Sequence, residues 1–144
     1  MMSGLDFPGA THQDIRGATQ YLLNISSKVA VMGFCMGGAL TIASAVHIPE
    51  CSAGICFYGI PPQDFADPRN ISVPFQGHFA NQDDWCTPEA VNELEKTLRQ
   101  CDVPHTIYRY DAAHAFFNEQ SDAYNIQAQR DAWKRVTAFL DEVF

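Results

Sequence analysis

Apolar and polar residues alternate along the chain in blocks that predict strands and helices in turn. Short apolar runs rich in β-branched residues predict strands at 28–34, 52–58, 73–80 and 105–110. Helical spacing of apolar residues predicts helices at 13–23, 36–47, 88–100 and 121–143. Strands that alternate with helices are typical of βαβ units, so the pattern predicts an α/β domain with about four parallel strands.

The first predicted strand leads into a glycine-rich turn with a cysteine at its centre. Residues 33–38 read Gly-Phe-Cys-Met-Gly-Gly, and a helix-compatible run follows them. This is the strand–turn–helix context of a nucleophile elbow, with Cys35 where serine is usual. Such a turn demands small residues two before and two after the nucleophile, which Gly33 and Gly37 provide, and Gly38 lets the helix approach the strand. The helix N-terminus at Cys35 favours a thiolate. The alternative is a buried structural cysteine in a glycine-rich turn.

Candidate acidic and histidine residues follow two later predicted strands. Asp83 and Asp84 come after 73–80, and His114 comes after 105–110. The order cysteine, acid, histidine matches that of an α/β-hydrolase triad. Since the carboxyl ends of parallel strands meet at one edge of the sheet, we expect these residues to lie together there. Asp111 is a third candidate for the acid, and His114 has the alternative of an ordinary loop histidine.

Composition narrows the classes of protein that fit. A chain of 144 residues, 47% hydrophobic, is long enough for one domain over 1–144 and too short for two. A net charge of −8 with nine basic residues argues against nucleic acid and anionic membranes as partners. We expect neither a membrane span nor a signal peptide. Five cysteines without metal-ligand spacing predict free thiols in the cytoplasm, with no metal or cofactor.

Three segments together resemble the dienelactone hydrolase family. They are the motif at 33–38, the stretch His78-Phe79-Ala80-x-x-Asp83, and the loop at 110–116. The resemblance covers nearly the whole chain, from about Gln13 to the end. It implies an α/β-hydrolase fold, a three-layer sandwich, and a Cys35–Asp83–His114 triad in which the spacing from His78 favours Asp83 over Asp84. The family's sheet has eight strands with the nucleophile on the fifth, so the chain corresponds to the C-terminal part and lacks the N-terminal strands.

The resemblance also implies an activity, cleavage of small carboxylic esters or lactones through a covalent acyl-enzyme. Met36 is expected to offer its backbone N–H to the oxyanion, while the family's second donor comes from a loop this sequence lacks. Trp85, Phe116 and Asn118 are expected to contact substrate. Asn118 stands where the family has a substrate-binding arginine, and the family's other arginine falls in the missing portion, so we expect neutral esters to be preferred to anionic lactones.

Two other readings of the sequence remain open. One is a different hydrolase on the same elbow, such as a thioesterase or a dehalogenase, although the usual dehalogenase nucleophile is aspartate. The other is a truncated, non-catalytic domain. Whichever function holds, we expect the strand that ends at Phe34 to be a sheet edge with unpaired backbone groups, which predicts a symmetric homodimer. The alternative is that the chain is a fragment of a longer protein.

Overall fold

Four parallel strands form the centre of the molecule, as a computed structural model that describes residues 4–144 shows; residues 1–3 of the expected domain lie outside the described residues. The strands are β1 (Ala30–Phe34), β2 (Ala53–Phe57), β3 (Phe75–Gln82) and β4 (His105–Ala113). They lie in the sheet in the order of the sequence, and each neighbouring pair is parallel. The predicted α/β class and parallel sheet are confirmed.

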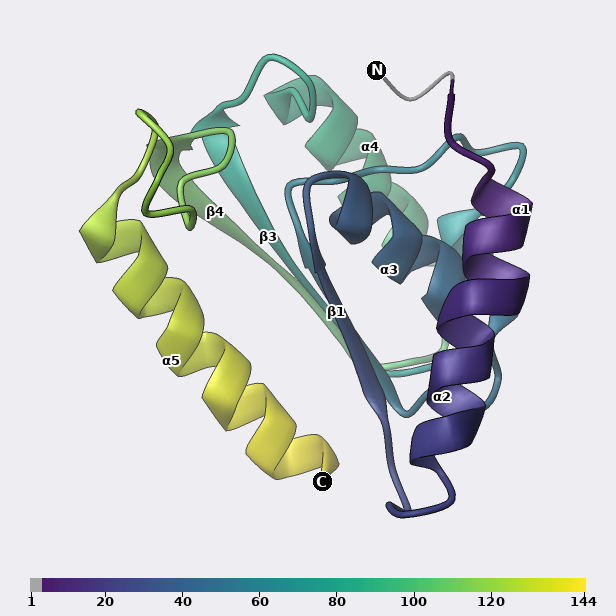
Figure 1. Cartoon of the computed structure of the whole chain (residues 1–144). Helices are drawn as coiled ribbons and strands as arrows, with labels where there is room; N and C mark the ends of the chain where they lie inside the picture. The colour runs from purple at the N-terminus through teal and green to yellow at the C-terminus, as the bar shows by residue number, and fades with distance from the viewer. Residues whose placement is uncertain (1–3) are drawn as a thin grey trace.

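Helices cover both faces of this sheet and make three layers (Figure 1). The N-terminal helical segment is continuous through α1 (Phe7–Gly9), the π-helical turn η1 (Ala10–Ile15) and α2 (Arg16–Leu22). This segment shares one side of the sheet with α3 (Met36–His47) and α4 (Pro88–Leu98), and α5 (Ile126–Val143) lies alone on the other. The crossover from β2 to β3 contains a short 3₁₀ turn, η2 (Pro68–Asn70).

Two helix starts differ from their predicted positions, and in both cases a capping side chain accounts for the difference. The first helix begins at Phe7 rather than residue 13, because the Asp6 carboxylate accepts a hydrogen bond from the Gly9 N–H at 3.0 Å. The last helix begins at Ile126 rather than 121, because the Asn125 side chain accepts from the Ala128 N–H at 3.1 Å. Residues 114–125 therefore form a loop at the end of β4.

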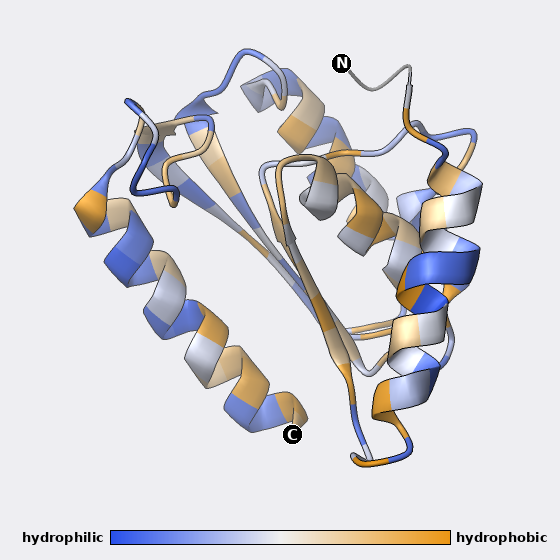
Figure 2. Cartoon of the chain, in the orientation of Figure 1, coloured by the Kyte–Doolittle hydropathy of each residue, from blue (hydrophilic) through white to orange (hydrophobic). Residues whose placement is uncertain are grey.

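The hydrophobic core has two parts, one on each face of the sheet. Buried residues of α3 and α4 pack against one face, and Ala128, Ala132 and Val136 of α5 pack against the other. In Figure 2, β1 is coloured mostly hydrophobic, whereas α5 alternates between hydrophobic and hydrophilic residues. The alternation is that of an amphipathic helix lying on a core.

A stack of rings crosses the sheet on the α5 side. Phe34, Phe57, His78 and Tyr108 are neighbours in the strand register, one from each strand. Their ring centroids are separated by 4.6, 4.5 and 5.5 Å along this row, with interplanar angles of 23°, 13° and 23°. The Arg135 guanidinium of α5 lies 4.2 Å from the Tyr108 centroid and closes one end. We call this row the ring ladder.

Strand β1 lies at one edge of the sheet, as expected from the sequence, and β4 lies at the other. Its central residue Met32 is 42% exposed, although methionine is usually buried. The edge strand therefore carries an apolar, uncovered side chain. Over residues 4–144 the helices are all too short or too polar to span a bilayer.

Candidate active site

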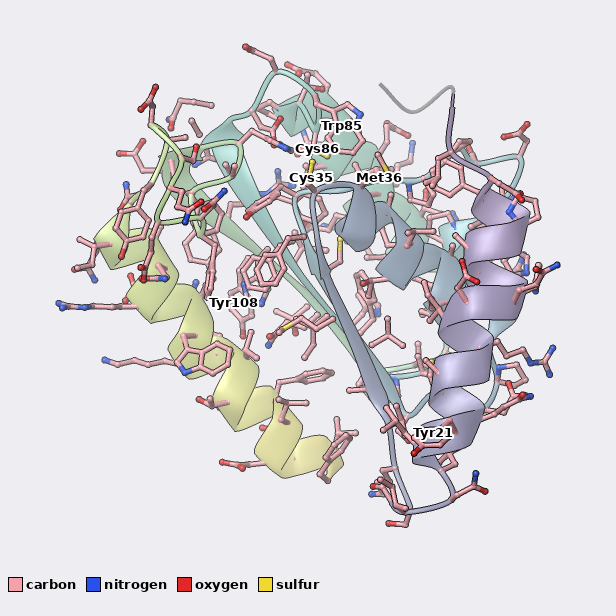
Figure 3. The ribbon with its side chains drawn as sticks, in the orientation of Figure 1. Tyr21, Cys35, Met36, Trp85, Cys86 and Tyr108 are labelled. Carbon is pink, nitrogen blue, oxygen red and sulfur yellow. The ribbon has the colours of Figure 1, made fainter. Side chains whose placement is uncertain are left out.

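The turn between β1 and α3 holds Cys35 in a strained conformation. Cys35 has φ 59° and ψ −119°, in a region that residues with side chains rarely adopt. Three backbone hydrogen bonds hold this conformation. The Cys35 N–H donates to the Phe57 carbonyl at 3.0 Å, and the Cys35 carbonyl accepts from the N–H groups of Gly38 and Ala39 at 2.9 and 3.2 Å. Figure 3 shows Cys35 and Met36 at the top of β1, where the elbow was predicted.

The glycines of the turn differ in what they permit. A Cβ at Gly33 would overlap the Gly37 carbonyl, and one at Gly38 would overlap the Phe57 carbonyl on the neighbouring strand. These two positions therefore require glycine, as expected. A Cβ at Gly37 would meet nothing within 4 Å. The expectation that Gly37 must be small was wrong, because a side chain at this position would point into open space.

His114 links the turn to the end of β3. Its Nε2 lies 3.2 Å from Cys35 Sγ, and its Nδ1 lies 2.7 Å from Asp83 Oδ2. The three residues come from the ends of β1, β3 and β4, which meet at the carboxyl edge of the sheet. The sulfur, the imidazole and the carboxylate thus form one hydrogen-bonded chain, which is the arrangement needed to remove a proton from the thiol.

Of the three candidate acids, the structure brings Asp83 to the histidine. Asp83 is 3% exposed, and its other oxygen, Oδ1, accepts hydrogen bonds from the Trp85 and Cys86 N–H groups at 2.8 and 2.9 Å. Asp84 is exposed. Asp111 accepts a hydrogen bond from the Gln82 side chain at 2.8 Å on the surface.

A pocket of about 400 Å³ lies beside the sulfur. We call it the Cys35 pocket, and its lining consists of Phe34, Cys35, Tyr58, Ala115, Phe117 and Asn118. Three of these residues are aromatic, and none is a lysine, arginine, aspartate or glutamate. A pocket of this kind suits an uncharged, mostly apolar group with one or two polar atoms.

The three residues expected to contact substrate fall in different places. Asn118 lines the Cys35 pocket, and the Trp85 ring lies 5.4 Å from that of His114. Phe116 was wrongly expected in a pocket wall: it is 0% exposed and packs against Tyr58 and Tyr110 in the core. Its neighbour Phe117 lines the pocket instead.

Sequence reasoning missed four of the lining residues: Phe34, Tyr58, Ala115 and Phe117. One signal was present for Tyr58, because it ends the run predicted as the second strand and so falls at the carboxyl edge where the other candidates lie. Phe34 and Phe117 are sequence neighbours of Cys35 and Asn118, but adjacency in sequence does not reveal which side chains face the pocket.

The surroundings of the other four cysteines oppose ionisation of their thiols. Burial raises the pKa of Cys51 to about 11 and that of Cys56 to about 12. Burial also raises the pKa of Cys86, where the nearby Asp83 charge adds to the effect, and that of Cys101. All five thiols are free, and among the described residues no three His, Cys, Asp or Glu side chains are grouped as metal ligands.

Curated relatives share much of this sequence. A Saccharolobus solfataricus protein named provisionally as a carboxymethylenebutenolidase is 38% identical over 119 residues, covering 81% of this chain and 45% of the relative. Protein usf of Aquifex pyrophilus is 34% identical over 118 residues, which cover 80% of this chain and 51% of the relative. The chain thus spans about half the length of these curated relatives.

Solved structures show the same fold at low identity. An esterase of Pyrococcus furiosus has a TM-score of 0.77 at 17% identity, over 98% of this chain and 65% of its own. A dienelactone hydrolase-like promiscuous phosphotriesterase from metagenomic libraries has a TM-score of 0.76 at 21% identity. The match covers 94% of this chain and 65% of that protein. The model of the dienelactone hydrolase family matches residues 5–144, and the chain therefore belongs to that family.

Proposed function

We propose that the protein hydrolyses small carboxylic esters with Cys35 as a covalent nucleophile. The observation that carries this proposal is the hydrogen-bonded chain from Cys35 Sγ through His114 to Asp83. Family membership and the esterases among proteins of the same fold support the reaction class. The neighbourhood of a general base distinguishes Cys35 from the other four thiols.

In the proposed mechanism, His114 Nε2 takes the thiol proton while Asp83 stabilises the imidazolium and holds its tautomer. The Cys35 sulfur attacks the ester carbonyl carbon, and the carbonyl electron pair moves onto oxygen. Met36 is the first residue of α3, so its N–H has no acceptor within the helix and is free to donate to this oxyanion. The C–O bond to the alcohol then breaks as His114 returns the proton to the leaving oxygen. Water, activated by His114, hydrolyses the thioester and releases the acid.

The substrates that we propose are small and neutral. The lining of the Cys35 pocket has no cationic side chain, and Asn118 occupies the position where the resemblance implies an arginine. The net charge of −8 also disfavours anionic substrates. An uncharged acyl ester is therefore a better fit than a carboxylated lactone.

We further propose that the chain works as a homodimer in a reducing compartment, the cytoplasm, and does not bind nucleic acid. The open β1 edge with the exposed Met32 supports self-association. The five free cysteines support a reducing environment, and the scarcity of basic residues argues against nucleic acid.

Trapping the acyl-enzyme tests the proposed function. Mixing the protein with p-nitrophenyl acetate should release a burst of p-nitrophenol equal to the number of active sites. Mass spectrometry of the quenched protein should find the acetyl group on Cys35, and alkylation with iodoacetamide beforehand should abolish the burst. Cys101→Ala, which removes another partly exposed thiol, is the matched control and should retain the burst. Acetyl transfer to other residues, or no transfer at all, would reject the mechanism.

A further inference from the structure

Three non-glycine residues between 4 and 144 have a left-handed φ, and all three line the Cys35 pocket. Cys35, Tyr58 and Ala115 have φ values of 59°, 36° and 69°. A side chain makes this region costly, by about 1–3 kcal/mol per residue. Strain of this kind persists only where surrounding structure imposes it, and it gathers at functional sites.

The mechanism proposed above accounts for two of the three. Cys35 occupies the elbow, and Ala115 follows His114 directly. It assigns no task to Tyr58, whose φ of 36° is especially unusual for a bulky residue. Tyr58 is therefore a strained aromatic residue of the candidate active site that has no role in that mechanism.

The backbone around Tyr58 fixes its side chain relative to the nucleophile. The Tyr58 N–H donates to the His78 carbonyl at 2.9 Å, which continues the pairing of β2 with β3 by one residue. A Cβ at the next residue, Gly59, would overlap the Cys35 carbonyl. The chain that leaves β2 thus lies in direct contact with the elbow.

The ring of Tyr58 packs within the site. It is 2% exposed, and its centroid lies 4.9 Å from that of His114 and 5.4 Å from that of Phe116. Contacts on the protein side hold the ring in one place, while the residue still forms part of the pocket lining. A polar group on such a ring is pre-organised.

The hydroxyl is suited to donate a hydrogen bond. Burial raises the pKa of Tyr58 to about 12, so the group keeps its proton near neutral pH. A protonated phenol hydroxyl has one proton to donate, which a ligand in the Cys35 pocket can accept.

We propose that the Tyr58 hydroxyl donates a hydrogen bond to the carbonyl oxygen of an ester bound at Cys35, beside the Met36 N–H. This inference rests on the proposed function. When the Cys35 sulfur bonds to the carbonyl carbon, the electron pair that moves onto the oxygen meets two donors instead of one. Tyr58 thereby adds a second donor to the Met36 N–H.

The substitution Tyr58→Phe tests this by removing the donor and keeping the ring. We expect kcat for p-nitrophenyl acetate to fall about 100-fold, with KM little changed, because the hydrogen bond strengthens as the oxyanion forms. Tyr108→Phe is the matched control, since it removes a hydroxyl from β4 away from the elbow (Figure 3). This control should retain kcat.

A second measurement separates a catalytic from a structural role. Alkylation of Cys35 by iodoacetamide displaces iodide at a CH₂ carbon and forms no oxyanion, so Tyr58→Phe should react at the wild-type rate. A parallel fall in alkylation and ester turnover would mean that Tyr58 only supports Cys35 and His114, and would overturn the inference. Unchanged turnover in Tyr58→Phe would overturn this inference and leave the proposed function standing. A wild-type protein that is never acylated would instead reject the proposed function and this inference together.

Discussion

Asp83 divides its two carboxylate oxygens between His114 and the backbone of its own loop. Oδ2 lies 2.7 Å from His114 Nδ1, and Oδ1 accepts the N–H groups of Trp85 and Cys86. The two backbone bonds fix the rotation of the carboxylate, and so they aim the remaining oxygen at the imidazole. A buried carboxylate held this way orients the ring and keeps the proton on Nδ1.

We expect Asp83→Asn to reduce esterase turnover strongly, by about 10⁴-fold, because an amide favours the wrong histidine tautomer. Asp84→Asn is the matched control, since Asp84 is adjacent and exposed, and should stay near wild-type. Steady-state kinetics on p-nitrophenyl acetate checks both. A larger loss in Asp84→Asn would assign the orienting role to the neighbouring residue.

Cys35→Ala should abolish ester hydrolysis and leave the fold intact, because the sulfur supplies the nucleophile while the glycines shape the turn. In the wild type, iodoacetamide at about neutral pH should label Cys35 ahead of the other four cysteines, since burial raises their pKa values and keeps them protonated. Peptide mapping measures the order of labelling, and circular dichroism checks the fold. Equal labelling of all five, or residual turnover in Cys35→Ala, would contradict the assignment.

Neutral esters should be hydrolysed with a higher kcat/KM than anionic lactones of similar size. The Cys35 pocket has three aromatic walls and no cation in its lining. Asn118→Arg should raise kcat/KM for a carboxylated lactone by at least about tenfold, as one charge-assisted hydrogen bond is worth about 1.5–3 kcal/mol. Asn118→Gln, which is longer but uncharged, serves as the control. A wild-type preference for the lactone would reveal an anion site elsewhere.

His78 should make the fold sensitive to acid. Its ring is fully buried, with Nδ1 2.8 Å from the Tyr110 hydroxyl and Nε2 2.9 Å from Gln76 Oε1. Burial, helped by the Arg135 charge, lowers the pKa of His78 to about 3. The unfolded chain takes up this proton below about pH 6.5 and the folded chain does not. The free energy of unfolding should therefore decrease from about pH 6.5 down to about pH 3, by up to ~1.4 kcal/mol per pH unit from this group.

Denaturant titrations across this pH range measure the effect. His78→Gln should flatten the pH dependence by one proton even where it lowers stability overall, whereas His105→Gln, at a partly exposed position on β4, should keep the wild-type slope. An unchanged slope in His78→Gln would show that other groups cause the acid sensitivity.

Self-association should be visible by light scattering at micromolar concentration as a two-chain species. The exposed Met32 lies at the centre of the edge strand, so Met32→Lys should shift the population toward monomer by charging that edge. Tyr21→Lys, which charges an exposed position on α2, controls for the effect of added charge. A wild-type monomer that is folded and active would refute the dimer.

The sequence was sufficient to predict the strands, their parallel pairing and the residues that meet at the carboxyl edge, because hydrophobic runs and the elbow motif are local signals. It was not sufficient for the loop at 114–125, where alternation between core and pocket follows from how the loop packs. Phe116 and Phe117 are chemically identical neighbours, and the core takes one and the pocket the other. The start of α5 also depended on a single cap at Asn125, which competes with other polar residues nearby.

The ring ladder also bears on how the strands find one another during folding. A slip of one residue along a strand would put a side chain from the opposite face of the sheet at the place of a ladder ring. In one direction, the slip would bring Gly33, Cys56, Gly77 or Ile107 into the row. A displaced strand would therefore lose its ring contacts with each adjoining strand. The ring ladder therefore favours the correct register in a sheet whose parallel strands are joined by long connections. Because Cys35 directly follows Phe34, the ring contacts that fix the register of β1 also fix how far the nucleophile lies beyond the carboxyl edge of the sheet.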